Sequence, residues 1–330
     1  MKIGFVGLFS QPSITGEISD ETHLAREMEA LGHQVYRIPR DEWREYIVEN
    51  FPKGKYVNVP EEVTFDIAII CKWHHFYGGV FIRAIREKYK CPVFYWLWDY
   101  MFDAGFPEWH LSMAQESDLY LTNEYGIKSW YQDYDVAKLY YFPFDVADQT
   151  IVKMAAPKKY DVTFFGSKLG QGDRVDWLRE INRYHPVKVF AWNFEEWQKE
   201  GFDAEQAVYG QEFAQKVAES KIMLGFSVNP SCWGYWSNRV GKVLTLGGFL
   251  LYQYAPGMEL FLRDGIEYFS SPQEAIEKID HYLIAEIERE AIALRGYMIG
   301  LDRFTSKARV KELMILIDRF LKTKGIGWHH

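Results

Sequence analysis

The sequence has few cysteines and no long hydrophobic run, and each shortage excludes a class of protein. Only Cys71, Cys91 and Cys232 occur in 330 residues, and their odd number and wide spacing argue against a disulfide framework and against a zinc cluster. No apolar run approaches the length of a membrane span, and the N-terminus reads as a strand followed by a loop, not as a secretory signal. We therefore expect a cytoplasmic protein with reduced thiols.

Several well-known ligand signatures are also missing. The segment after the first predicted strand lacks the G-x-G-x-x-G spacing, because Gly4 and Gly7 lie within the strand and Gly16 comes much later. Neither a P-loop lysine motif nor a metal-binding DxD-like pair stands in a convincing position. We predict no metal site and no cofactor.

Composition and charge indicate which substrates and acceptors the protein favours. Hydrophobic residues make up 48% and charged residues 25%, as in soluble globular proteins, and the 17% of aromatic residues mildly favours a carbohydrate substrate. Residues 1–145 carry 14 Lys+Arg against 22 Asp+Glu, a net charge of −8, whereas residues 146–330 carry 24 of each. The acidic first half disfavours a nucleic-acid acceptor without excluding one.

The order of apolar segments predicts two similar α/β domains. Strand-like segments alternate with helical patterns, which is typical of a doubly wound parallel sheet. In the first half, the predicted strands are residues 2–8, 33–38, 65–71, 92–98 and 118–122. The pattern restarts at residues 161–165, where DVTFFG has the character of the N-terminal KIGFVG. We predict two Rossmann-like domains facing across a cleft, residues 1–145 and 146–330.

Residues 220–271 form the most informative segment, which reads as strand, polar loop, helix, Gly-Gly turn and strand. The run 222–226 predicts a buried parallel strand, and the polar loop leads into a helix from about Asn238. Free backbone N–H groups and the helix dipole would meet at residues 237–240, beside Arg239. We predict an anion site for a phosphate or diphosphate, although a first-turn arginine is more often a solvated surface residue.

This segment resembles the C-terminal domain of GT-B glycosyltransferases, most closely the branch typified by the spore-maturation protein CgeB. The matching residues are Phe226-Ser227, Arg239, Gly247-Gly248, Phe249-Leu250-Leu251, Leu260-Phe261, Gly265, Glu267 and Tyr268. Lys242 departs from the pattern, because the family has a Glu there that holds the donor ribose, and a lysine cannot accept hydrogen bonds from ribose hydroxyls. The resemblance implies the GT-B fold, a nucleotide-sugar donor such as a UDP-sugar, metal-independent transfer, and a last helix over residues 306–321 that packs back onto the first domain.

Other donor-side candidates follow the carboxyl ends of predicted strands, where open parallel sheets bind ligands. Gly166 permits close backbone approach and Lys168 could reach a phosphate, although a solvated lysine in a turn is an equally good interpretation. Trp192 could form an aromatic wall for a nucleobase, but a structural role is the safer interpretation. The full donor-side set is Gly166, Ser167, Lys168, Trp192, Asn193, Ser227, Asn229, Ser237, Asn238, Arg239 and Lys242.

Transfer to a hydroxyl needs a base or a group that stabilises developing charge. Asp99 directly follows the apolar strand VFYWLW, where low polarity would raise the pKa of a carboxyl group, although a helix cap is an equally good interpretation. His74 and His75 follow the strand DIAIIC and are the alternative bases. The acceptor-side candidates are Ser10, Gln11, Ser13 and Asp103.

We therefore predict a glycosyltransferase that moves a sugar from a nucleotide diphosphate to a hydroxyl of a glycan, a protein or a small molecule. Two alternatives stay open. One is an enzyme of the same fold that acts on DNA bases, as some phage glucosyltransferases do. The other is a non-catalytic nucleotide-binding or sugar-binding protein, which the departure at Lys242 makes more credible.

Overall fold

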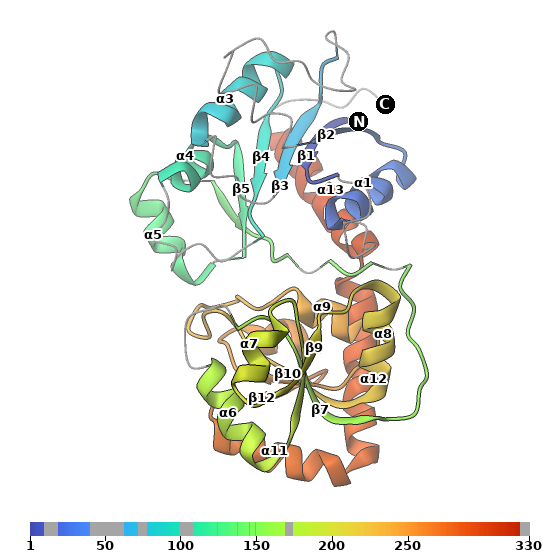
Figure 1. Ribbon diagram of the computed structural model, residues 1–330. Helices are drawn as coiled ribbons and strands as arrows, with labels where there is room; N and C mark the ends of the chain where they lie inside the picture. Colours follow the sequence, from blue (N-terminus) through green and yellow to red (C-terminus); the bar gives the residue numbers. More distant parts are fainter. Residues whose placement is uncertain are drawn as a thin grey trace.

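The computed structural model describes residues 1–9, 19–39, 63–71, 78–98, 108–123, 125–136, 138–144, 146–148, 150–168 and 174–323. Within these residues the chain forms two six-stranded parallel sheets, each covered by helices, and the two units lie one above the other (Figure 1). The predicted fold class, two doubly wound α/β units, is confirmed. None of the described helices combines the length and apolar character that a bilayer span requires.

The first sheet has the strand order β2-β1-β3-β4-β5-β6. Its strands are β1 (Lys2–Gly7), β2 (Gln34–Pro39), β3 (Ile67–Cys71), β4 (Val93–Trp96), β5 (Leu119–Thr122) and β6 (Leu139–Tyr141). The register places Ile3 of β1 between Val35 of β2 and Ile67 of β3. The edge strand β6 pairs with β5, with Tyr140 opposite Leu121.

The second sheet has the order β12-β11-β10-β7-β8-β9. Its strands are β7 (Tyr160–Phe165), β8 (Val187–Ala191), β9 (Asp203–Gln206), β10 (Ser220–Gly225), β11 (Leu250–Gln253) and β12 (Glu267–Phe269). The central strands β8 and β10 are almost wholly buried, because helices cover both faces of a parallel sheet.

Helices form layers on the two faces of each sheet. The helices of the first unit are α1 (Asp20–Ala30), α3 (Gly78–Tyr89), α4 (Glu108–Glu116) and α5 (Lys128–Asp133), with a short 3-10 turn, η2 (Tyr125–Ile127). Those that follow are α6 (Arg174–Tyr184), α7 (Phe194–Lys199), α8 (Gly210–Glu219), α9 (Arg239–Leu244), α10 (Met258–Leu262), α11 (Pro272–Ile284), α12 (Glu286–Arg303) and α13 (Ser306–Thr323). Alternate strand residues therefore enter two separate apolar clusters in each unit.

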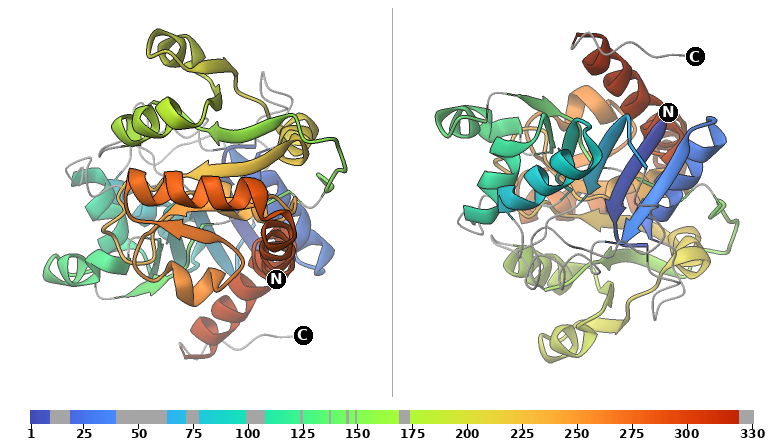
Figure 2. Two further views of the ribbon diagram at one scale, coloured as in Figure 1. Left: turned by 90° about the horizontal axis from the view of Figure 1, so that it is seen from below. Right: turned by 90° about the horizontal axis from the view of Figure 1, so that it is seen from above.

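The C-terminal helix α13 leaves the second unit and packs on the first. Its buried residues Val310, Leu313 and Ile317 join the cluster that also contains Leu24 and Met28 of α1. Figures 1 and 2 show α13 beside α1 and the N-terminal strand. The chain therefore crosses between the units twice, once after β6 and once between α12 and α13.

Candidate functional site

A cavity of about 350 Å³ lies at the carboxyl edge of the second sheet. Parallel sheets expose loops and helix ends at this edge, so it is the expected place for a ligand. The cavity is lined by residues that directly follow β7, β8 and β9 and by the beginning of α9. These residues are Phe165, Gly166, Ser167, Phe190, Ala191, Trp192, Ala207, Val208, Tyr209, Phe213, Ser237, Asn238, Arg239 and Lys242.

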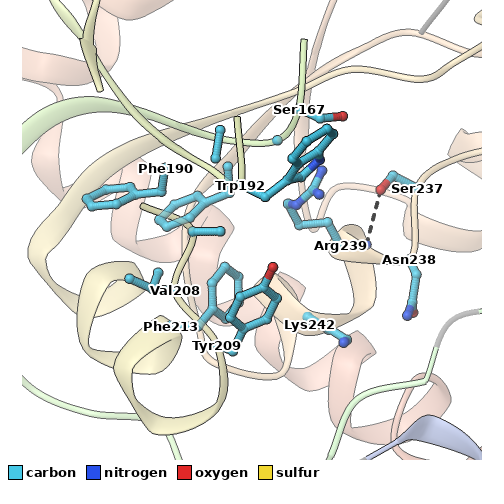
Figure 3. Close-up of a pocket in the computed structure, with 14 residues that line it drawn as sticks. Ser167, Phe190, Trp192, Val208, Tyr209, Phe213, Ser237, Asn238, Arg239 and Lys242 are labelled. Atoms are coloured by element: carbon cyan, nitrogen blue, oxygen red, sulfur yellow. Dashed lines mark hydrogen bonds between the residues drawn. The ribbon is translucent and has the colours of Figure 1, made fainter. Parts of the chain in front are cut away.

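The two sides of the cavity differ in chemistry. Aromatic side chains from β8, the loop after β9 and α8 form one side, and Trp192 at its mouth is 56% exposed. Arg239 and Lys242 of α9 supply positive charge to the other side, next to the hydroxyls of Ser167 and Ser237 (Figure 3). Such a site suits a ligand with a flat ring at one end and negative charge at the other.

Arg239 is the charged centre of this site. Its side chain is half-buried, and desolvation together with the nearby Arg174 guanidinium lowers its pKa to about 10. Desolvation also lowers the pKa of Arg174, whose Nη1 donates to the carbonyl oxygen of Ser167 at 3.5 Å. Both groups remain protonated at neutral pH. Two guanidinium groups that repel each other in a poorly hydrated space would both gain from a bound anion.

The backbone at the start of α9 differs from the sequence expectation. The N–H of Ser237 donates to the Tyr252 hydroxyl at 3.1 Å, the N–H of Arg239 to the Ser237 hydroxyl at 3.3 Å, and the N–H of Val240 to the Ser237 carbonyl at 2.9 Å. The prediction of free amides across residues 237–240 is therefore wrong for these three groups. Because α9 is also only six residues long, the side chains, and not the helix end, must supply most of the attraction for an anion.

Seven of the eleven predicted donor-side residues line the cavity: Gly166, Ser167, Trp192, Ser237, Asn238, Arg239 and Lys242. Trp192 lines the cavity and is 56% exposed, so its side chain is not part of the packed core. The remaining four residues do not line it.

Lys168 and Asn193 serve the local fold beside the cavity. Lys168 forms an ion pair with Glu200, which also binds Arg179 at 2.7 Å. Asn193 is buried, accepts a hydrogen bond from the Lys168 N–H at 3.4 Å and donates to Glu196 at 3.1 Å. The interpretation of Lys168 as a phosphate ligand therefore has no support in this geometry.

Ser227 and Asn229 organise the loop after β10. The buried Ser227 hydroxyl lies within hydrogen-bonding distance of the carbonyl oxygens of Asn229 and Tyr235, at 3.2 and 3.3 Å. The side-chain oxygen of Asn229 accepts from the N–H of Ser231 at 2.9 Å. These two residues hold the loop that leads to Ser237 and are not among the residues that line the cavity.

The cavity edge also meets the first unit. The Asn238 side-chain oxygen accepts a hydrogen bond from the N–H of Val146 at 2.8 Å, and Lys242 Nζ lies 3.7 Å from a carboxylate oxygen of Asp20 at the start of α1. Nearby, the hydroxyl of Tyr141 donates to the carbonyl oxygen of Gly234 at 2.6 Å. The site therefore borders the contact between the two units.

All of the predicted catalytic and acceptor-side residues lie outside the described residues. They are Asp99, His74, His75, Ser10, Gln11, Ser13 and Asp103. Their roles stay predictions.

Seven of the fourteen lining residues are absent from the predicted donor-side set. Phe190, Tyr209 and Phe213 line the cavity, and Arg174 lies close enough to Arg239 to affect its pKa. Tyr209 has a readable signal, because it follows β9, but that strand was not predicted.

Comparison with known proteins agrees with this architecture. Residues 154–315 match a family model described as glycosyl transferase-like, and this stretch contains the whole second sheet and the cavity. Sucrose-phosphate synthase from Thermosynechococcus elongatus superposes with a TM-score of 0.68 and 10% identity over 98% of this chain and 99% of that one. The fold is GT-B.

Two further GT-B structures carry ligands. Anabaena Alr3699/HepE in complex with UDP and glucose has a TM-score of 0.64 and 13% identity, over 97% of this chain and all of that one. An alpha-glucosyltransferase in complex with UDP-glucose and DNA has a TM-score of 0.64 and 12% identity, over 96% and 98% of the two chains. Identities this low establish the fold and not the activity. No curated protein matches the sequence.

Proposed function

We propose that this chain is a glycosyltransferase that moves a sugar from a nucleoside diphosphate sugar to an acceptor hydroxyl. The observation that carries the proposal is the cavity at the carboxyl edge of the second sheet, which has aromatic walls on one side and Arg239 on the other. The glycosyl transferase-like match over residues 154–315 and the UDP complexes among GT-B structures support it. We take a UDP-sugar as the donor, and the resemblance to the CgeB branch remains a prediction.

The geometry suggests how the donor lies. The nucleobase would stack near Trp192 and Tyr209, and the diphosphate would lie toward Arg239, with Lys242 adding positive charge. As the bond between the anomeric carbon and the diphosphate breaks, negative charge grows on the departing phosphate oxygens. Arg239 and the nearby Arg174 would stabilise that charge electrostatically. Metal-independent transfer follows as part of the proposal, and an undiminished rate in EDTA tests it.

The acceptor completes the reaction from the side of the first unit. Its hydroxyl oxygen forms the new bond to the anomeric carbon and loses its proton to a base, for which Asp99 is the candidate and His74 or His75 the alternative. Asp99→Asn should lower the rate of transfer while leaving donor binding unchanged. An unaltered rate would transfer the role to one of the histidines.

The nature of the acceptor can be tested separately. We propose a glycan, a protein or a small molecule, because the first half of the chain is acidic and repels a polyanion. One structure of the same fold holds DNA, so binding to duplex DNA should be measured at two salt concentrations. Tight binding that weakens steeply with salt would favour a nucleic-acid acceptor.

A panel of nucleotides and nucleotide sugars tests the proposal as a whole. A true donor should raise the melting temperature, because it binds only the folded state, and the enzyme should hydrolyse it slowly in the absence of an acceptor. Arg239→Ala should abolish both effects, whereas Arg319→Ala, an exposed arginine of α13, should preserve them. Stabilisation without hydrolysis or transfer would indicate a binding protein, and no stabilisation by any nucleotide would refute the proposal.

A further inference from the structure

Helix α12 is held to the second unit through glycines on its inner face. A Cβ atom at Gly296 would lie 2.3 Å from the carbonyl oxygen of Gly265, and one at Gly300 would lie 2.8 Å from the backbone nitrogen of Thr245. Real side chains do not approach backbone so closely, so the glycines allow the helix to pack directly on α9 and on the turn before β12. The inner face of α12 is therefore covered by the second unit of the same chain.

The outer face of α12 is apolar and uncovered by the described part of the chain. Ile287 is 89% exposed, Leu294 54%, Met298 63% and Leu301 47%. Ala291 is also exposed. We call these five residues the outer stripe. A contiguous row of large exposed apolar side chains is unusual on a monomeric soluble protein and marks an interaction surface.

The spacing of the outer stripe indicates what covers it. Its positions, 287, 291, 294, 298 and 301, follow one another at alternating intervals of four and three. This is the heptad repeat with which one helix packs along another. The row runs for nearly the whole length of α12, which lies along the side of the second unit (Figure 1). The stripe therefore fits a second helix of similar length.

The charges beside the outer stripe favour another copy of α12 in the opposite direction. Three exposed glutamates, Glu286, Glu288 and Glu290, flank its first half. The partners of these carboxylates are His281 and the buried Arg289, and Lys158 also lies near, so three glutamates outnumber the two permanent cations beside them. Three cations, Arg295, Arg303 and Lys153, lie along its second half, and Lys153 stands over the ring of Tyr297. They outnumber the two carboxylates there, Asp264, which lies 2.7 Å from Arg295, and Asp302 beside Arg303. Antiparallel pairing brings each acidic half near the other copy's basic half, whereas parallel pairing would bring the glutamates together.

The exposed area is sufficient for a specific contact. With the neighbouring Ile284, which is 87% exposed, the stripe presents on the order of 600 Å² in each copy, or about 1,200 Å² in a pair, at the lower end of stable interfaces. One face packing on itself about a two-fold axis gives a closed dimer. We propose that the outer stripe pairs two copies of this chain as an antiparallel, two-fold symmetric homodimer.

Charge substitutions within the outer stripe test the pairing. Sedimentation or light scattering should show a dimer for the native chain, and Leu294→Glu and Leu294→Lys should each raise the dissociation constant by about tenfold or more, because each removes a buried leucine. An equal mixture of the two variants should dimerise again, because opposite charges then meet near the two-fold axis. Ile315→Glu, which alters an exposed residue of α13, is the matched control and should remain dimeric.

Cross-linking tests the direction of the helices. If Leu294 packs beside the partner's Met298, then Ala291 lies beside the partner's Leu301. The described native cysteines are all buried, so introduced thiols on α12 should react selectively. A mixture of Ala291→Cys and Leu301→Cys chains should form a mixed disulfide faster than either variant forms one with itself. Rapid self-linking of Ala291→Cys would indicate parallel helices and overturn the antiparallel arrangement.

Three other results would overturn the homodimer. The first is a native chain that stays monomeric at every concentration measured, and the second is a dimer that Leu294→Glu leaves unchanged. The third is a monomer that binds lipid vesicles through the stripe, with Leu294→Glu abolishing that binding. Nucleotide binding should be the same in native and Leu294→Glu chains, because Leu294 is exposed on the outer face of α12 and does not line the cavity. The dimer and the proposed function therefore succeed or fail independently.

Discussion

Replacing Arg239 with glutamine should stabilise the ligand-free protein and weaken its binding to a nucleoside diphosphate. Desolvation and the Arg174 guanidinium lower the pKa of Arg239 from 12.5 to about 10. Because the pKa is lower in the folded than in the unfolded chain, the folded state disfavours the charge at every pH below about 10. The difference corresponds to about 3 kcal/mol at neutral pH, and partial solvent access reduces it. The neutral variant should recover part of that energy.

The assay is a thermal melt of each variant with and without UDP. Arg239→Gln should melt about 1–3 °C above the native chain without ligand, since 1 kcal/mol corresponds to roughly 1–2 °C for a chain of 330 residues. Its stabilisation by UDP should nearly vanish, because hydrogen bonds from a guanidinium to phosphate contribute about 1.5–3 kcal/mol, or about ten- to a hundredfold in affinity. Arg319→Gln should change neither quantity. A variant that melts earlier than the native chain and still responds fully to UDP would refute the reasoning.

Three further predictions concern stability. Burial lowers the pKa of His110 to about 3, below the value of 6.5 in an unfolded chain. Because the unfolded chain then binds a proton that the folded chain does not, the free energy of unfolding should fall by about 1.4 kcal/mol per pH unit below pH 6.5. Urea titrations at several pH values measure this slope, which His110→Phe should lose. Gly296→Ala should lower the free energy of unfolding by about 1–3 kcal/mol despite the higher helix propensity of alanine, because the new methyl group meets the Gly265 carbonyl. Tyr141→Phe should cost about 1 kcal/mol in chemical denaturation, through the lost hydrogen bond to Gly234.

Strands were predictable from the sequence where both of their faces are buried. The strands β3 and β4 are buried on both faces and therefore read as continuous apolar runs. The edge strand β9, with the sequence DAEQ, buries only Ala204, while its acidic residues Asp203 and Glu205 pair with Lys188. The sequence predicted no strand there, because an edge strand held by ion pairs has no apolar signature.

The sequence analysis did not predict helix α12, because this helix has too many apolar positions and not too few. Apolar residues lie on both faces of this helix: Ile292 is on its buried face and Leu294 is on its exposed face. A helix with apolar residues on both sides has no single stripe, so the period that identifies an amphipathic helix is blurred. The structure shows which apolar residues of α12 are buried within the chain and which are exposed on its outer face.

The candidate site was predictable as a location and only partly as a set of side chains. The rule that ligands bind beyond the carboxyl ends of parallel strands selected Ser167, Trp192 and Arg239, which all line the cavity. The rule cannot tell which neighbouring charge has a partner inside the protein. Lys168 pairs with Glu200, a residue 32 positions away in the sequence, and such pairing is a property of the folded chain.

The same short helix that carries Arg239 also connects the two units. Asn238, just before it, holds the N–H of Val146, and Lys242, one turn later, pairs with Asp20 of α1. Both residues line the cavity as well, so the anion that we propose beside Arg239 would compete with Asp20 for the Lys242 ammonium group. If Lys242 is attracted to the anion and not to Asp20, the relative free energies of different arrangements of the two units change. We therefore expect binding of the proposed donor to be coupled to the contact between the units through Asn238, Arg239 and Lys242.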